Sequence, residues 1–202
     1  DFDYIYFNYS SSWNYMPLKL ARRYTNAKII CHSHNSYYSH SFSNKMLMFL
    51  LDKLNSKGQK IFNKKADLKI ATSKDSALWM FNTLDNVTIV NNGIELEDFK
   101  FDNEARKKLR DKLNIADNDK LFGFAGVLQD RKNPIFAVNV FATYVKKNPK
   151  SYLLIIGKGP LKAKIEEVSK ELKIDDKIKF ITYTNELNKW YSALDKIGRA
   201  HV

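Results

Sequence analysis

The sequence predicts an α/β fold in which parallel strands alternate with helices. Short apolar runs rich in β-branched and aromatic residues recur along the chain, and stretches with helical periodicity separate them. Parallel strands need long crossover connections, which are usually helices, so this alternation favours parallel sheets. The 202 residues suffice for one large hydrophobic core or two modest ones.

The first part of the chain carries one series of these elements. Apolar runs predict strands at 4–9, 27–31, 68–71 and 87–90. Periodicity predicts helices at 16–23, 41–64 and 104–113, and one that Ser73 caps and that ends at Phe81. A turn signal at 91–93 and the polar stretch 95–120 then indicate a connector.

The remaining residues repeat the pattern. Strands are expected at 121–125, 152–156 and 177–181, and helices at 132–147, 161–172 and 186–194. We place the boundary between two sheets near 114–120. Residues 1–115 and 116–196 are therefore expected to form two partial domains.

Cysteine content, hydrophobicity and charge limit the kinds of protein that this sequence can encode. The single cysteine, Cys31, excludes a disulfide framework within the chain and favours a reducing compartment. No apolar run reaches the roughly 18–20 residues that a membrane-spanning helix needs. The net charge of +12 is shared by both parts of the chain. A solvated surface explains it most simply, and attraction to phosphates or to an anionic membrane is the alternative.

Two strand–loop–helix joints predict a place for phosphate. The strand ending at Ala125 runs through Gly126 to Lys132, which is expected to open a helix, and the strand ending at Ile156 runs into Gly157-Lys158-Gly159-Pro160. Such joints direct backbone N–H groups and a helix N-terminus at one spot, where Lys132 adds an ammonium. The pattern predicts a nucleotide-type ligand. Ordinary turns and exposed charges are the alternative.

Five segments, in order along the chain, resemble blocks of the family-4 glycosyltransferases of the GT-B fold, in their bacterial capsular and exopolysaccharide branch. They are residues 30–36 with His32-Ser33-His34-Asn35-Ser36, 67–73, 90–94, 124–133 and 156–161. The resemblance spans roughly residues 3–195. It implies a GT-B type fold with two Rossmann-like parallel-sheet domains, an acceptor-side one and a donor-nucleotide one, both truncated here.

The resemblance also implies a reaction. A retaining, hexosyl-type glycosyltransferase would move a sugar from a nucleotide-sugar donor to a saccharide acceptor, expected to be lipid-linked, in cell-surface polysaccharide synthesis. No cofactor is expected, because the nucleotide sugar is a substrate. The expected setting is cytoplasmic, with peripheral contact to the inner face of an anionic membrane as an open alternative.

Site residues follow from the same resemblance. His34 and Lys132 are the expected catalytic residues, His34 near the donor sugar and the acceptor, and Lys132 on the β-phosphate of the leaving diphosphate. The expected donor-binding residues are Gly126, Arg131, Lys132, Asn133, Gly157, Gly159 and Thr182. Val127 stands where the family usually has an arginine, and Arg131 is the candidate to replace it.

A metal site is not expected. His32 and His34 straddle Ser33, so their side chains should share one side of an extended strand, but no Cys, Asp or Glu accompanies them in that loop. Asp1-Phe2-Asp3 and Asp117-Asn118-Asp119 have the spacing of a D-x-D motif, and solvated turns explain both.

A non-catalytic basic module that binds nucleotides or nucleic acid is the alternative function. The net charge and the aromatic content support it, whereas the sequence lacks a nucleic-acid-binding signature and its charge is not concentrated in one stretch. No nucleic-acid partner is therefore expected.

The two ends suggest an incomplete sequence. Asp1 begins within a strand-like pattern, and Ile197-Gly198-Arg199-Ala200-His201-Val202 can be encoded by the text of a common sequencing adapter. We expect residues 197–202 to be a non-native tail. The chain also lacks the family's later Glu-containing segment that binds donor ribose and sugar, so we expect no transferase activity from it alone.

Overall fold

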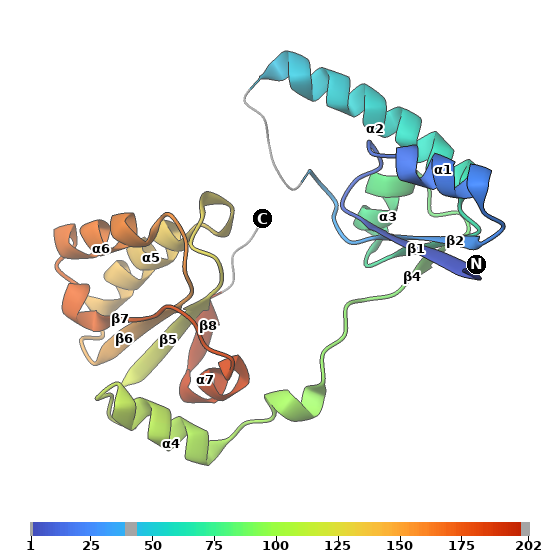
Figure 1. Cartoon of the computed structure of the whole chain (residues 1–202). Coiled ribbons are helices and arrows are strands. Elements are labelled where there is room, and N and C mark those ends of the chain that lie inside the picture. The colour runs from blue at the N-terminus through green and yellow to red at the C-terminus, as the bar shows by residue number, and fades with distance from the viewer. Residues whose placement is uncertain (1, 39–43, 199–202) are drawn as a thin grey trace. The chain divides into compact units, whose positions relative to one another are not determined.

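The computed structural model describes residues 2–38 and 44–198 (Figure 1). The chain divides into two compact units, Asp1–Ile94 and Glu95–Val202. We refer to them as unit 1 and unit 2. No helix in the described ranges is long and apolar enough to cross a bilayer.

Unit 1 holds a four-stranded parallel sheet in chain order, β1 to β4. Its strands are β1 (Tyr4–Tyr9), β2 (Lys28–Ser33), β3 (Leu68–Ala71) and β4 (Val87–Ile89). The helices between them are α1 (Met16–Tyr24), α2 (Lys45–Lys65) and α3 (Lys74–Phe81). Strands added in one direction through right-handed crossovers place their helices on one face of the sheet.

Burial along β2 shows which face the helices cover. Ile29 and Cys31 are fully buried and belong to the core of unit 1, together with Leu18 of α1, Phe62 of α2 and Phe81 of α3. The alternate residues of β2 are less buried because they point to the opposite face. The described helices therefore leave that face of the sheet open.

Two of the expected helices of unit 1 begin at side-chain caps. Ser73 accepts a hydrogen bond from the backbone N–H of Ser76, and the Ser76 hydroxyl accepts one from the N–H of Ser73, so the predicted cap of α3 is confirmed. Asn44 caps α2 through the N–H groups of Met46 and Leu47. The sequence placed this helix from residue 41, and residues 41–43 lie outside the described ranges.

Unit 2 holds a second four-stranded parallel sheet, in the order β7-β6-β5-β8. Its strands are β5 (Lys120–Ala125), β6 (Ser151–Ile156), β7 (Ile178–Ile181) and β8 (Lys196–Gly198). The helices are α4 (Asn103–Lys112), α5 (Pro134–Val145), α6 (Lys162–Glu171) and α7 (Leu187–Ala193), with short 3₁₀ turns η1 (Leu96–Phe99), η2 (Asp130–Lys132) and η3 (Asp175–Lys177).

Two cores sandwich the sheet of unit 2. Leu153 and Ile155 of β6 pack in the core that contains residues of α5 and α6, whereas Leu154 and Ile156 pack in the core with residues of α7. Because successive side chains of a strand point to opposite faces, α5 and α6 cover one face and α7 the other. The hydrophobic run of β6 is the pattern of a strand buried on both faces.

The boundary between the units differs from the expected one. The division falls between Ile94 and Glu95, not near residues 114–120, and α4 packs against α7 within unit 2. The reason is electrostatic. Arg110 of α4 is completely buried, and its guanidinium group donates to the carbonyl oxygen of Ala193 and to the Asp195 carboxylate. Helix α4, which was expected to belong to a polar connector, is therefore part of unit 2.

Strand β8 was not predicted, and it sets the topology of unit 2. Its three residues, Lys196 to Gly198, pair in parallel with Phe122–Phe124 of β5. The expected non-native tail begins at Ile197, within β8, and residues 199–202 lie outside the described ranges. From β5 the chain proceeds to β6 and β7 on one side and returns to β8 on the other. This reversal is a topological switch point, where open α/β sheets bind ligands beyond the carboxyl ends of the strands.

Candidate nucleotide site at the carboxyl ends of the second sheet

The expected donor-binding residues follow β5, β6 and β7 at one edge of the sheet. Residues 126–133 follow β5, residues 157–161 follow β6, and Thr182 follows β7. Parallel pairing places Ala125 beside Ile156 and Ile156 beside Ile181, so the three loops start at the same level. The structure therefore places Gly126, Gly157 and Thr182 in a row at the carboxyl ends of β5, β6 and β7, and Gly126 lies nearest the switch point.

Backbone hydrogen bonds tie these loops to one another. The N–H of Gly126 donates to the Ile156 carbonyl oxygen at 2.9 Å, and the N–H of Gly157 donates to that of Ile181 at 2.8 Å. Two residues further along both loops, the Leu128 N–H donates to the Lys158 carbonyl oxygen at 3.0 Å. The loops thus form one connected backbone surface.

Two glycines are required at this surface by conformation. Gly126 has φ of +153° and Gly157 has φ of +151°, values that residues with a side chain rarely adopt. A Cβ atom on Gly157 would lie 1.9 Å from the Gly126 carbonyl oxygen, and one on Gly159 would lie 2.4 Å from that of Leu128. Only glycine allows the two loops to approach this closely.

Replacing Gly157 with alanine is expected to lower the free energy of unfolding of unit 2 by about 1–3 kcal/mol from the strained backbone alone, with the overlap on Gly126 adding to it. Gly93→Ala is the matched control, because a Cβ there meets no atom within 4 Å. Its effect should stay within about 0.5 kcal/mol. Urea unfolding followed by amide NMR signals measures both, and equal effects of the two substitutions would contradict the geometry.

Lys132 does not open helix α5, which corrects the expected helix start. Lys132 ends the 3₁₀ turn η2, and Asn133 follows in the left-handed conformation with φ of 46°. The Asn133 side-chain oxygen accepts the N–H of Phe136 at 3.4 Å, and Pro134 is the first helical residue. Asparagine as the cap and proline at the first position define this start better than the lysine does.

Lys132 and Asn133 lie at a cavity of about 370 Å³. Its walls include Phe122 and Phe124 of β5, Phe136 of α5 and Gly198 of β8. The Lys132 ammonium makes no ion pair within residues 2–38 and 44–198. An uncompensated cation beside the helix N-terminus is suited to an anionic ligand. Gly198 was not expected at this cavity, because strand β8 was not predicted.

Val127, which replaces the expected arginine, is 51% exposed on the loop after β5. Arg131 lies in η2 beside Lys132 and has interactions of its own. Lys158 is exposed in the loop after β6 and adds positive charge that the sequence prediction did not include. The candidate site therefore combines Lys132, Lys158 and Arg131 with the backbone N–H groups of the loops.

The second expected catalytic residue, His34, lies in unit 1 directly after β2. As its spacing predicts, it shares a side of the strand with His32, and the two ring centroids are 4.0 Å apart. Asn8 contacts His34, and Tyr6 contacts His32. Within the described residues no group of three or more Cys, His, Asp or Glu side chains is arranged to hold a metal ion.

Burial lowers the pKa of His32 below its usual value, and the neighbouring His34 lowers it further. His34→Gln is therefore expected to raise the pKa of His32, which should remain below about 6.5 because the burial persists. The contribution of neutral His32 to the free energy of unfolding is complete above about pH 6.5, the ordinary histidine pKa. It is lost as the pH falls through the lower pKa of His32 in the folded state. NMR titration of the imidazole protons tests this, and an unchanged His32 pKa in the variant would contradict it.

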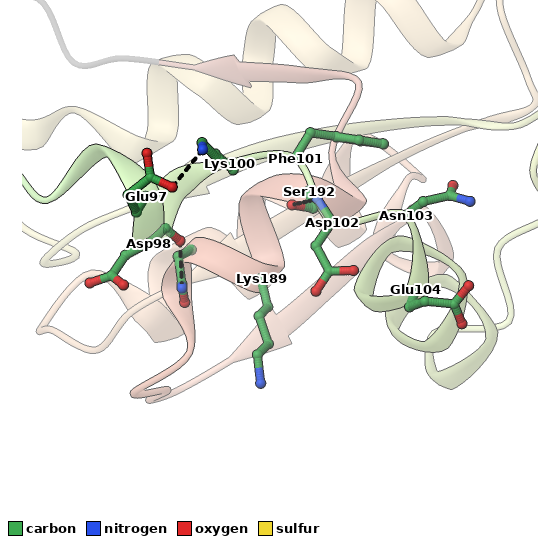
Figure 2. A pocket seen from close by; sticks show the side chains of 10 residues that line it. Glu97, Asp98, Lys100, Phe101, Asp102, Asn103, Glu104, Lys189 and Ser192 are labelled. Carbon is green, nitrogen blue, oxygen red and sulfur yellow. Dashed lines mark hydrogen bonds and ion pairs between the residues drawn. The ribbon is translucent and has the colours of Figure 1, made fainter.

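A second pocket in unit 2, of about 470 Å³, lies away from the switch point (Figure 2). Its lining comes from η1, the start of α4 and α7, and includes Glu97, Asp98, Lys100, Asp102 and Lys189. Several of its polar groups already serve the fold. Lys100 pairs with Glu97 at 2.5 Å, and the Asp102 N–H donates to the Ser192 hydroxyl at 3.0 Å. The pocket is where the segment after residue 94 packs on α7.

Comparisons with known proteins support the fold. Residues 105–197 match the model of a family described as Glycosyl transferases group 1. The chain is 22% identical over 170 residues to a Bacillus subtilis protein named "Putative glycosyltransferase EpsF", covering 82% of this chain and 43% of that protein.

Solved structures agree. HepE from Anabaena, in complex with UDP and glucose, superposes with a TM-score of 0.77 at 18% identity over 98% of this chain and 52% of that chain. A glycosyltransferase from Rickettsia africae gives 0.67 at 17% identity, over 98% and 51%. The predicted fold class is confirmed: the two parallel sheets are the Rossmann-like halves of a GT-B fold. The chain spans about half the length of these relatives.

Proposed function

We propose a glycosyltransferase function for this chain, in which unit 2 holds the nucleoside diphosphate of a nucleotide-sugar donor. The observation that carries the proposal is the joined loop surface at the switch point, with Gly126 and Gly157 in glycine-only conformations and Lys132 beside it. The family match of residues 105–197 supports it. The neighbour HepE, solved with UDP and glucose, supports the class of ligand.

The chemistry is electrostatic. When the bond between the sugar and the diphosphate breaks, negative charge grows on the β-phosphate, and a fixed cation lowers the energy of that state. Lys132 supplies the charge in this proposal. Gly126, Gly157 and Gly159 let the ligand approach the backbone, Asn133 positions the start of α5, and Thr182 and Arg131 complete the donor contacts.

We further propose that a hexosyl group is transferred with retention of its anomeric configuration. The leaving diphosphate stays on the side of the acceptor and takes up the proton of the acceptor hydroxyl. The acceptor proposed is a lipid-linked saccharide of a cell-surface polysaccharide. The exposed apolar side chains in the first half of α2 support the proposal that the acceptor is attached to a lipid. Met46 is 74% exposed and Phe49 is 57% exposed. The Lys53 ammonium lies 4.4 Å from the centre of the Phe49 ring. Apolar side chains flanked by lysines suit an anionic bilayer surface.

Calorimetric titration tests the donor proposal. UDP should bind more tightly than uridine, because the phosphates provide the contacts to Lys132 and the loops. Equal affinities for the two would contradict a diphosphate site.

Calorimetric titration with an oligonucleotide tests the alternative function, a basic nucleic-acid-binding module. Its support is the net charge of +12. That function predicts oligonucleotide binding that weakens steeply with salt and that UDP does not displace.

A further inference from the structure

Four polar side chains gather on the open face of the sheet in unit 1: Tyr6, Asn8, His32 and His34. We refer to them as the histidine cluster. Asn8 of β1 and His32 of β2 are paired in the register of the sheet. Tyr6 lies two residues before Asn8, and His34 lies two residues after His32, so all four side chains share one face. The Tyr6 hydroxyl is 2.5 Å from His32 Nδ1, and His34 Nε2 is 2.8 Å from Asn8 Oδ1.

The backbone of His34 is held from both sides. Its N–H donates to the Tyr9 carbonyl oxygen at 3.3 Å, which continues the pairing of β1 with β2. The Thr72 N–H donates to the carbonyl oxygen of Ser33 at 3.0 Å, and the buried Ser33 hydroxyl donates to that of Ser76 at 2.7 Å. The position of the imidazole therefore depends on its own two side-chain torsions and on its neighbours.

Asn8 determines which nitrogen of His34 carries the proton. The contact joins the amide oxygen of Asn8, which can only accept, to His34 Nε2. With the amide in this orientation, Nε2 carries the proton. In the neutral ring Nδ1 then keeps its lone pair and is free to accept a hydrogen bond.

His32 packs against His34 as an uncharged ring. Its Nδ1 contacts Tyr6, whereas its Nε2 is buried and has no partner within the described residues. A protonated His32 would place a positive charge on a ring whose Nε2 is buried without a partner, which is unfavourable. The side chains that contact the ring of His34 are Asn8 and His32, and neither is a carboxylate that could compete with Asn8 for its proton.

We propose that Asn8 is a positioning residue that fixes His34 with its proton on Nε2, so that Nδ1 accepts a hydrogen bond from a saccharide hydroxyl. His32 packs against the ring of His34, and Tyr6 contacts His32. The saccharide partner rests on the proposed function, whereas the protonation pattern rests on the geometry of unit 1 alone.

Nitrogen-15 NMR of the imidazole rings tests the pattern directly on the 202-residue chain. At a pH at which the ring is neutral, the signals of His34 should show Nε2 protonated and Nδ1 unprotonated. Asn8→Asp keeps an oxygen acceptor and should preserve this pattern, whereas Asn8→Leu should give a mixture of both tautomers. Asn26→Leu, an exposed asparagine of the same unit, is the matched control and should change nothing. Asn8 is itself exposed, so its variants are expected to fold.

Two results would overturn the proposal. The first is protonation of Nδ1 in the wild type with a switch to Nε2 in Asn8→Asp, which would mean that Asn8 donates. The second is an unchanged pattern in Asn8→Leu.

Glucose serves as the hydroxyl probe. Its addition should shift the His34 Nδ1 signal in a saturable manner in the wild type and less in Asn8→Leu, and no shift would overturn the assignment of the hydroxyl partner. UDP binding in unit 2 is measured separately, so a failure of the proposed donor function is recognised independently of the histidine cluster.

Discussion

Lys132→Ala is expected to weaken UDP binding by roughly 10- to 150-fold. A hydrogen bond to a charged group contributes about 1.5–3 kcal/mol, which corresponds to that change in the dissociation constant. The reason is the position of Lys132 at the end of η2, beside the cavity at the switch point and without an ion-pair partner among the described residues. Isothermal titration calorimetry at low and moderate salt measures the effect.

Lys147→Ala is the matched control for this experiment. Lys147 is exposed just beyond the opposite end of α5, and its removal changes the net charge of the chain by the same amount. UDP affinity should stay nearly constant in this variant. Equal losses in the two variants would show that UDP responds to overall charge and not to Lys132.

Asp195→Ala is expected to lower the free energy of unfolding of unit 2 by about 3–5 kcal/mol, because it leaves a buried guanidinium group without its counter-charge. The Asp195 carboxylate contacts Arg106 at 2.8 Å and Arg110 at 3.3 Å, and it accepts the N–H of Leu121 at 2.8 Å. Arg110 is completely buried. The loss should be seen in urea unfolding followed by the amide NMR signals of β5 and α4.

The Asp195 carboxylate also makes the free energy of unfolding of unit 2 depend on pH. Burial alone would raise the pKa of Asp195, but the Leu121 N–H and the charges of Arg106 and Arg110 outweigh it and hold the pKa below its usual value. This stabilisation is complete above about pH 3.9 and is lost as the pH falls through the lower pKa of the folded state.

Asp176→Ala serves as the matched control, since Asp176 is 71% exposed and its pair with Lys177 spans 3.8 Å. A similar destabilisation in both variants would contradict the role of the buried network.

The alternation of apolar runs and helical periods was sufficient to predict most of the fold. The strand from Leu68 to Ala71 and the cap at Ser73 are confirmed because hydrophobic runs and capping residues are local signals. The pairing of His32 with His34 is also confirmed, since residues two apart in a strand share a face.

The features that the sequence did not predict depend on long-range contacts. Strand β8 has three residues, all exposed, and it forms only because β5 offers an edge for pairing. Arg110 looks like one more surface charge of a polar helix, and its burial depends on Asp195, 85 residues away. The start of α5 is different, because Asn133 and Pro134 carried a local signal that the lysine obscured.

The loops at the switch point of unit 2 are proposed to bind a nucleoside diphosphate. Amide NMR mapping with UDP tests it most directly. Binding at these loops should give saturable shifts of the signals of Gly126, Lys132, Gly157 and Thr182, with little change in unit 1. Shifts confined to the pocket around residues 97–104 and 188–192, or the absence of any saturable shift, would contradict it.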